Sequence, residues 1–415
     1  MPNPSNLNRS LPNRRRFIRT ASLAGLAGWV GGHAWLALAE PTVTLPFENG
    51  ERPLVKYPQK RPLIRITTRP PQLETPFEVF NESVITPNDA FFVRYHLSES
   101  PPLEVDADAF RLEVKGKVNS RLVLSIADLK SMFEPVEVVA VNQCSGNSRG
   151  FFQPRVAGGQ MGNGAMGNAR WKGASLKEVL ERAGVATGAR QVTFNGIDRP
   201  LVEKTPDYVK GLEIDHALDG EVMLAYQMNG ADLPMLNGYP LRLVVPGYYG
   251  TYWVKHVNEI TVIDEAFNGY WINPAYRIPD NPCACVEPGM IPKKTVPINR
   301  LNVRSFITSL KDGDRIRSGQ TTLVKGIAFD GGYGIREVLF TDDGGLSWRA
   351  AELSEDLGKY SFRAWQIAFS PKQAGSFELK VKATNRVGQS QPIEPLWNPA
   401  GYMRNVVETV RVIAV

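Results

Sequence analysis

Ser376-Phe-Glu-Leu-Lys-Val-Lys-Ala383 alternates polar and apolar side chains from end to end. Phe377, Leu379 and Val381 would face one side and the charged residues between them the other. This is the period-2 pattern of a half-buried antiparallel strand. The stretch therefore predicts that this part of the chain is built from β-sheet with one buried face.

Short segments of the same character surround this strand. Turn residues separate them, and Asp342-Asp-Gly-Gly345 has the composition of a hairpin turn. Because none of these segments shows a helical period, residues 302–415 predict an all-β, immunoglobulin-like sandwich without the disulfide of that fold. The other expected strands are residues 321–329, 335–340, 361–369 and 409–415.

The preceding part of the chain mixes element types. Ser125 and Ser175 each stand before a helical segment and have an acidic residue three positions on, Asp128 and Glu178. Both pairs indicate a capping box, and we expect the second to be the stronger because it contains glutamate. Residues 112–118 are expected to form a strand.

Two more strands are expected on either side of the loop Pro246-Gly-Tyr-Tyr-Gly250, at residues 241–245 and 254–263. The mixture predicts an α+β domain, and the Pro- and Asn-rich residues 266–301 would connect it to the sandwich. The Pro-containing residues that precede it suit an extended arm with no core. The predicted organisation is a leader (1–39), the arm (40–60), the α+β domain (61–290) and the sandwich domain (291–415).

The leader resembles an export signal. Arg14-Arg-Arg-Phe-Ile-Arg19 precedes an apolar run without charges, residues 21–38, and small residues allow cleavage after Ala39. The paired arginines followed by Phe-Ile match the twin-arginine signal, which exports folded proteins and so favours a cofactor protein. This predicts a periplasmic protein with no membrane span after cleavage. The alternatives are an ordinary secretion signal and a permanent membrane helix.

The leader also carries most of the excess positive charge. The chain has 48 basic and 42 acidic residues, and residues 1–39 hold five arginines and no acidic residue. Without the leader the chain is close to neutral. Its composition therefore gives no support for nucleic-acid binding.

Three cysteines are too few for the disulfide framework of a small exported protein. Cys283 and Cys285 could form a strained bridge, bind a second metal or remain as buried thiols, and we expect the buried thiols. The sequence contains no Cys-x-x-Cys-His, so covalent haem is not expected. A redox role would therefore need a separate electron carrier.

Cys144 lies in the polar run Asn142-Gln-Cys-Ser-Gly-Asn-Ser-Arg149, which contains no other cysteine. A thiolate is a soft metal ligand, and Arg149 could lower the thiol pKa and hold an anion beside the metal. The alternative is a buried, unreactive thiol, since free cysteine is among the most buried residue types.

Four motifs follow one another at specific spacings, although none is specific alone. They are Phe91-Phe-Val-Arg-Tyr-His96, Cys144-Ser-Gly-Asn-Ser-Arg149, Gly167-Asn-Ala-Arg-Trp-Lys-Gly173, and Leu241-Arg-Leu-Val-Val-Pro-Gly247 with Val254-Lys255. With them the chain resembles the sulfite oxidase family of molybdenum enzymes, and is most similar to bacterial periplasmic sulfite dehydrogenases. The resemblance implies an α+β molybdopterin-binding domain followed by an immunoglobulin-like dimerisation domain.

The resemblance implies molybdenum bound to a single molybdopterin, with Cys144 as its one protein ligand. A structural zinc site, the alternative, would want about four clustered side-chain ligands. Arg94 and Arg149 are implied to bind the substrate anion, which suits guanidinium groups that donate paired hydrogen bonds. His96 is implied to contact the cofactor, the alternative being a core histidine. Tyr276 is implied to hydrogen-bond the substrate and assist proton movement, the alternative being packing.

The phosphate of the pterin calls for basic side chains and backbone amides in tight loops. Trp171, by contrast, is expected to pack in the core. Asn237 does not decide the substrate, because animal sulfite oxidases have histidine there and a reductase relative has asparagine. The residues implied to contact the pterin are Asn88, Arg94, His96, Ser148, Asp198, Asn237, Arg242, Trp253, Val254 and Lys255.

The implied reaction is the oxidation of sulfite to sulfate. Its electrons would leave singly to a separate c-type cytochrome, because the chain lacks the cytochrome b5-type haem domain of the animal enzymes. A homodimer, or a heterodimer with the cytochrome, is implied. One alternative is an oxidoreductase of the same fold that acts on a protein-bound sulfane or a sulfoxide. The alternative from a different class is a cofactor-free exported binding protein.

Overall fold

The structure is a computed structural model that describes residues 40–97, 104–200 and 202–415, so the predicted leader lies outside the described residues. Residues 40–60, expected as an arm without a core, instead form strands of an antiparallel sheet. Val55 is buried in a cluster with Leu63 and Tyr95, and Lys60 is 3% exposed. The expectation was wrong because the arm forms a hairpin that pairs with β3 and extends the sheet that carries Arg94. This sheet consists of β1 (Thr42–Thr44), β2 (Glu51–Val55), β3 (Leu63–Thr67), β4 (Gln72–Glu74) and β5 (Val93–Arg94).

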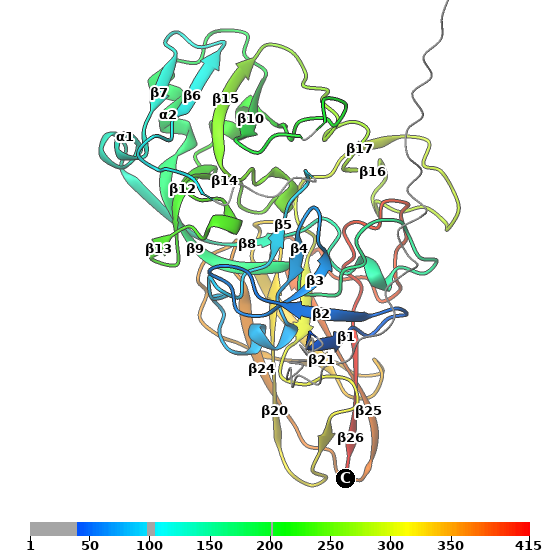
Figure 1. Ribbon diagram of the computed structural model, residues 1–415. Coiled ribbons are helices and arrows are strands. Elements are labelled where there is room, and N and C mark those ends of the chain that lie inside the picture. The colour runs from blue at the N-terminus through cyan, green and yellow to red at the C-terminus, as the bar shows by residue number, and fades with distance from the viewer. Residues whose placement is uncertain (1–39, 98–103, 201) are drawn as a thin grey trace, which may run out of the picture. The chain divides into compact units, whose positions relative to one another are not determined.

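Two further sheets complete the α+β part of the chain (Figure 1). The two strands expected around the 246–250 loop belong to different sheets. A single antiparallel β-bridge, between Arg242 and Lys255, joins the two segments. One sheet has the order β11 (Lys210–Glu213), β10 (Gln191–Gly196), β15 (Val257–Ile263), β6 (Leu112–Gly116) and β7 (Leu122–Leu124). The other has the order β13 (Ala231–Asp232), β12 (Met223–Met228), β9 (Met166–Ser175) and β8 (Pro135–Gln143), with β14 (Arg242–Val244) paired to β12.

The helices are short, and the two expected capping boxes differ. Before α1 (Ile126–Met132), the Ser125 hydroxyl accepts from the Asp128 backbone N–H at 3.0 Å and the Asp128 carboxylate accepts from the Ser125 N–H at 2.8 Å. Before α2 (Leu176–Ala183), Ser175 makes no side-chain cap, so the box expected to be stronger does not form. No helix among the described residues is long and apolar enough to cross a membrane. The remaining helical segments are α3 (Ile214–Ala217) and the 3-10 turns η1 (Phe77–Asn81), η2 (Arg149–Phe151), η3 (Met235–Asn237) and η4 (Gly250–Tyr252).

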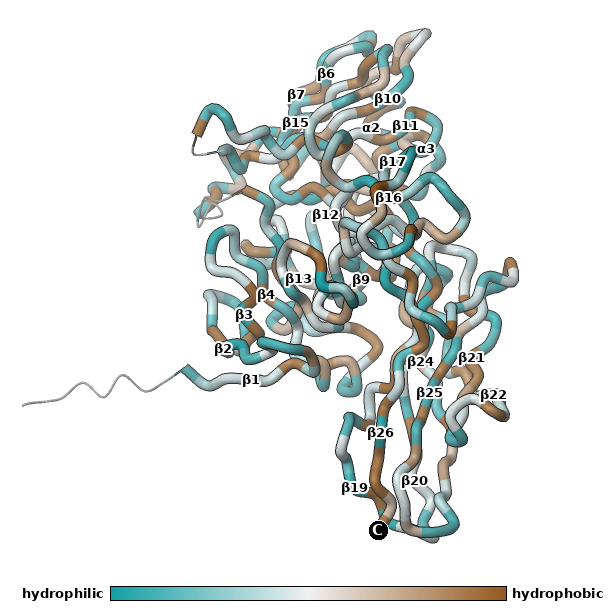
Figure 2. The backbone as a smooth tube through the Cα atoms, turned by 90° about the vertical axis from the view of Figure 1, so that its right-hand side faces the viewer, coloured by the Kyte–Doolittle hydropathy of each residue, from teal (hydrophilic) through white to brown (hydrophobic). Residues whose placement is uncertain are grey.

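The predicted sandwich is confirmed. Leu379, Val381 and Ala383 of the alternating stretch are buried in one core with Val338 and Trp365. Figure 2 shows hydrophobic and hydrophilic stretches interspersed along the strands of this part of the chain. One sheet has the order β18 (Arg304–Ile307), β20 (Thr322–Phe329), β24 (Arg363–Phe369) and β23 (Glu352–Leu353). The facing sheet has the order β19 (Arg315–Ile316), β26 (Thr409–Ala414), β25 (Gly375–Asn385), β21 (Ile335–Thr341) and β22 (Arg349–Ala350).

The sandwich shares a hydrophobic core with the α+β part. Phe306, Phe329 and Phe362 belong to the same buried cluster as the apolar residues of β8, β9 and β14. A buried polar contact crosses the same boundary, where Arg304 is 1% exposed and donates to the Ser148 hydroxyl at 2.7 Å. The two parts of the chain are therefore packed as one body between residues 40 and 415.

Cys283 and Cys285 are joined by a disulfide, so the expectation of two buried thiols was wrong. They lie in the surface loop that connects β16 (Arg277–Pro279) with β17 (Thr295–Pro297), where Cys283 is exposed. The loop is closed by the Asn281 side-chain oxygen, which accepts from the Cys285 N–H at 3.1 Å. Cys283 is exposed and Cys285 is half-buried, so this loop does not bury its two sulfur atoms as the sequence had led us to expect.

Candidate active site

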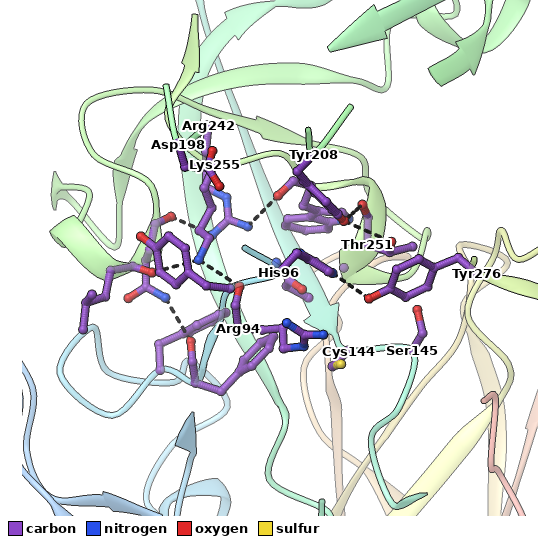
Figure 3. Close-up of a pocket in the computed structure, with 18 residues that line it drawn as sticks. Arg94, His96, Cys144, Ser145, Asp198, Tyr208, Arg242, Thr251, Lys255 and Tyr276 are labelled. Carbon is purple, nitrogen blue, oxygen red and sulfur yellow. Dashed lines mark hydrogen bonds between the residues drawn. The ribbon is translucent and has the colours of Figure 1, made fainter. Parts of the chain in front are cut away.

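One cavity collects most of the predicted site residues. It encloses about 630 Å³ of space, including its open mouth, and lies where β5, the end of β8 and the loops after β10 and β14 meet. Figure 3 shows Cys144, Ser145 and Tyr276 at one end, Asp198, Arg242 and Lys255 at the other, and Arg94 and His96 between them. The predicted residues that line it are Arg94, His96, Cys144, Asp198, Asn237, Arg242, Trp253, Lys255 and Tyr276.

Cys144 directly follows β8 and is the free thiol among the described residues. Its backbone N–H donates to the Ala165 carbonyl at 2.9 Å, and its carbonyl accepts from the Asn147 N–H at 3.0 Å. The side chain is 7% exposed and faces the cavity. These contacts hold a single sulfur donor at a fixed place in the cavity wall.

Arg94 ends β5 and directs its guanidinium toward Cys144 (Figure 3). Its Nη1 atom is buried and has no hydrogen-bond partner among the described residues. Desolvation opposes the charge, but the neighbouring Tyr276 and Cys144 favour it, so the pKa of Arg94 is raised above its usual value. A permanent positive charge with an unused donor therefore faces the cavity beside the thiol.

His96 and Tyr276 form a buried hydrogen-bonded pair, with 2.6 Å between Nε2 and the hydroxyl oxygen. The Tyr208 ring stacks on His96 at 3.8 Å, and Trp271 meets it edge-on at 5.3 Å. Burial among these rings lowers the pKa of His96 well below its usual value and raises that of Tyr276. The imidazole is therefore neutral and the phenol protonated near neutral pH. Tyr276 has a backbone φ of 57°, a strained conformation that its surroundings must hold in place.

The opposite end of the cavity concentrates positive charge. Arg242 is 3% exposed, lies over the Trp171 ring at 5.0 Å and has an Nε without a partner among the described residues. Lys255 donates to the Arg94 carbonyl at 2.9 Å, and Lys60 from the N-terminal hairpin is buried nearby. Desolvation lowers the pKa of Arg242 to about 9 and that of Lys60 to about 7. Asp198 alone offsets these cations in the cavity lining, so an anion bound here would be stabilised.

Comparison with known proteins agrees with this arrangement. Residues 98–271 match the family described as "Oxidoreductase molybdopterin binding domain", and residues 295–414 match "Mo-co oxidoreductase dimerisation domain". The chain is 34% identical over 393 residues to mitochondrial sulfite oxidase of Rattus norvegicus, covering 90% of this chain and 69% of that protein. The chain belongs to the sulfite oxidase family of molybdenum enzymes.

A second relative supports the same family, and a solved structure has the same fold. Sulfite oxidase of Gallus gallus is 32% identical over 86% of this chain and 79% of that protein. The crystal structure of the sulfane dehydrogenase SoxCD from Paracoccus pantotrophus has the same fold, with a TM-score of 0.71, 22% identity and coverage of 94% of this chain and 93% of that one. This member of the sulfite oxidase family is therefore a molybdenum oxidoreductase with a molybdenum-molybdopterin cofactor.

The residues of the cavity fit that cofactor. Cys144 offers the soft sulfur that molybdenum needs at one end, and the cationic cluster at the other end suits the pterin phosphate. Four buried polar atoms of the lining have no partner among the described residues, as expected where a hydrogen-bonding group is to be received. They are Arg94 Nη1, Asn142 Oδ1, Ser145 Oγ and Arg242 Nε.

Several residues that the resemblance assigned to the pterin do not reach the cavity lining. The Asn88 side chain is engaged by Met228 and Asn229. The Ser148 hydroxyl accepts a hydrogen bond from Arg304. Val254 is buried and is not among the residues that line the cavity. Asn237 does line the cavity, but its side-chain oxygen accepts from Lys60 and its amide donates to the Phe92 carbonyl at 3.0 Å.

Arg149 also stands apart from the cavity lining. Its Nε donates to the Ala400 carbonyl at 3.2 Å and its Nη1 to the Gly159 carbonyl at 3.4 Å. Its guanidinium carbon lies 5.2 Å from the ring centre of Tyr402. The structure therefore separates the two arginines predicted as a substrate-binding pair, and Arg94 alone faces the cavity.

The sequence did not reveal some of the residues at the site. Asn142 and Ser145 could have been inferred, because they flank Cys144 in the run that was singled out. Tyr208, which stacks on His96, and Tyr402, which stacks on Tyr276, lie in segments without a recognisable motif. Only the folded chain brings Tyr208 to the cavity lining and Tyr402 against the ring of Tyr276.

The lowered pKa of His96 leads to a prediction for histidine NMR. His96 and His256 should keep the nitrogen shifts of neutral imidazole from about pH 8 down to about pH 5.5, since ordinary histidine titrates near 6.5. His256 is buried between Tyr95 and Tyr239, and burial lowers its pKa to about 3. Because the unfolded chain binds these protons more readily, the stability due to both is present above about pH 6.5 and declines at lower pH. Assignment uses His96→Asn and His256→Asn, and titration of His96 near 6.5 would contradict its burial.

Proposed function

We propose that the protein oxidises sulfite to sulfate at its molybdenum-molybdopterin centre. The observation that carries this proposal is the guanidinium of Arg94, which faces the cavity beside Cys144 with an unused donor. A small oxyanion is bound best by a group that stays charged and offers directed N–H donors. The membership in the sulfite oxidase family supports the same substrate class.

The chain's own residues would orient the anion and manage a proton. The bound cofactor supplies the oxygen-atom transfer and accepts the two electrons. Arg94 binds the anion and stabilises its charge. Burial keeps Tyr276 protonated. With the proton of His96 on Nε2, the imidazole donates to the Tyr276 oxygen, and the phenol is left to donate its own proton toward the substrate. Enclosure of His96 by aromatic rings keeps water from this pair.

We further propose that the electrons pass singly to a separate c-type cytochrome and that the protein works in the periplasm after twin-arginine export. The arginine pair of the leader supports the location. The assembly would be a homodimer through the sandwich domain or a heterodimer with the cytochrome. The match of residues 295–414 to a dimerisation domain supports this assembly.

The proposal can be tested by three measurements on one preparation of natively expressed, purified protein. Elemental analysis should find molybdenum in proportion to protein, and sulfite should drive reduction of cytochrome c faster than other sulfur donors do. Light scattering should give twice the mass of the chain, or the mass of its complex with the cytochrome. Molybdenum without sulfite turnover would reject sulfite as the substrate, and a folded, natively expressed sample without molybdenum would contradict the assignment of the cofactor.

A second candidate is the oxidation of another sulfur compound, such as a protein-bound sulfane, or the reduction of a sulfoxide. The position of Arg149 favours it, because only one arginine of the expected pair faces the cavity. A free dianion gains from two guanidinium groups, whereas a substrate that carries less charge at sulfur needs fewer. Comparison of sulfite with a sulfane donor in the assay above, together with a sulfoxide tested for oxidation of reduced cytochrome c, separates the two candidates.

A further inference from the structure

Tyr402 reaches the active site from the sandwich domain. It ends a turn in which the Asn398 side chain accepts from the Tyr402 N–H at 3.1 Å and donates to the Tyr402 carbonyl at 2.8 Å. The next residue, Met403, donates its N–H to the Ser145 carbonyl at 3.3 Å. The turn is thus hydrogen-bonded to the residue beside Cys144. Asn398 on one side of Tyr402 and Met403 on the other fix its position.

Three glycines leave room for Arg149 behind this turn. A Cβ atom at Gly146 would lie 2.6 Å from the guanidinium carbon of Arg149, and one at Gly158 would lie 2.9 Å from its Nη1. A Cβ atom at Gly401, where φ is +61°, would lie 2.9 Å from the Arg149 Cγ. Contacts this close would force the arginine to move. The space that these three glycines leave open therefore determines where the Arg149 side chain can lie.

The ring of Tyr402 covers Arg149 and contacts the active site at the same time. It lies 5.2 Å from the Arg149 guanidinium carbon, a cation–π distance. It also stacks parallel to the ring of Tyr276, with centres 5.4 Å apart and planes 6° apart. Tyr276 lines the cavity and Arg149 does not. The tyrosine from the sandwich therefore stands at the boundary between the cavity and the arginine.

We propose that Tyr402 is a specificity-determining residue that holds Arg149 away from the cavity and so weakens the binding of small, free oxyanions. Two Arg149 donors are occupied by the carbonyls of Ala400 and Gly159, and the guanidinium face is covered by the ring. Removal of the ring takes away the contact on that face, so that the guanidinium can turn and direct its remaining in-plane N–H donors toward an anion held by Arg94. The inference rests on the proposed function in that the ligand is an oxyanion of sulfur.

The test measures anion binding as well as turnover. In Tyr402→Ala of the molybdenum-loaded protein, the Kd of sulfate by calorimetry and the KM for sulfite should both fall about tenfold, the effect of one added charge-assisted hydrogen bond. Tyr402→Phe keeps the ring over the guanidinium and should not reproduce the fall in either constant. In an Arg149→Gln background, Tyr402→Ala should change neither constant, because the effect acts through the arginine.

The sulfate titration separates this inference from the proposed function. A wild-type protein that does not turn over sulfite would reject the function, but the sulfate Kd of the variants would still decide the role of Tyr402. An unchanged or higher Kd in a folded Tyr402→Ala protein would overturn the inference, as would an equal fall in the Arg149→Gln background. Should Tyr402→Ala not fold by circular dichroism, Tyr402→Leu, which retains more apolar volume, decides by the same criteria.

Discussion

Cys144→Ser should abolish sulfite-dependent cytochrome reduction and leave the fold intact. The side chain is 7% exposed and its backbone is fixed by Ala165 and Asn147, so one atom changes in a place that already tolerates a polar neighbour. A serine hydroxyl is a hard, protonated oxygen and does not replace a thiolate as the ligand of a soft metal site. Turnover should fall to the limit of detection, and thermal unfolding should shift by less than a few degrees, as for a substitution costing about 1 kcal/mol.

A matched cysteine control is available elsewhere in the chain. The disulfide of Cys283 with Cys285 lies at the surface, and its double replacement by serine should retain molybdenum and turnover. Normal turnover in Cys144→Ser would reject the thiol as the metal ligand. Loss of turnover together with an unfolded spectrum would show a packing role instead.

Arg94→Gln should lower kcat/KM for sulfite about 10²- to 10³-fold, the range for removal of one preorganised donor to a charged group. The guanidinium is buried, faces Cys144 and carries an unused donor, so its loss leaves the anion without its main partner. Arg94→Lys restores the charge but not the paired donors, and it should recover only part of the rate. Steady-state kinetics measures the loss in kcat/KM, and titration with sulfate measures the loss in anion binding.

The control for Arg94 is an arginine of the same charge outside the site. Arg121 is exposed and pairs with Glu113, and Arg121→Gln should leave kcat/KM unchanged. An Arg94→Gln protein with full activity would exclude Arg94 from substrate binding. Because Arg149 lies behind Tyr402, Arg149→Gln alone should have a smaller effect than Arg94→Gln.

The sequence was informative where local pattern and fold agree. The alternation through Leu379 and Val381 predicted a half-buried strand, and the structure buries both residues. Cys144, Arg94 and Lys255 could be placed because each lies in a motif with fixed spacing, and all three line one cavity.

The sequence was misleading where long-range contacts decide. The arm before Lys60 looked irregular because its strands are short, yet it pairs as a hairpin and buries that lysine against Asn237. Arg149 has the right motif but a different neighbourhood, since Tyr402 arrives from more than two hundred residues further along the chain. The capping box predicted from Ser175 and Glu178 fails for a similar reason. Ser175 is the last residue of β9, and its side chain makes no capping hydrogen bond.

The contact of Met403 with Ser145 has a consequence for the order of events during synthesis. While the ribosome is still making the segment with Asn398 and Tyr402, the Ser145 carbonyl lacks this partner and Tyr276 lacks the ring that stacks on it. The surroundings of Cys144 are therefore completed late in synthesis, because Met403 lies more than two hundred residues beyond Ser145 in the chain.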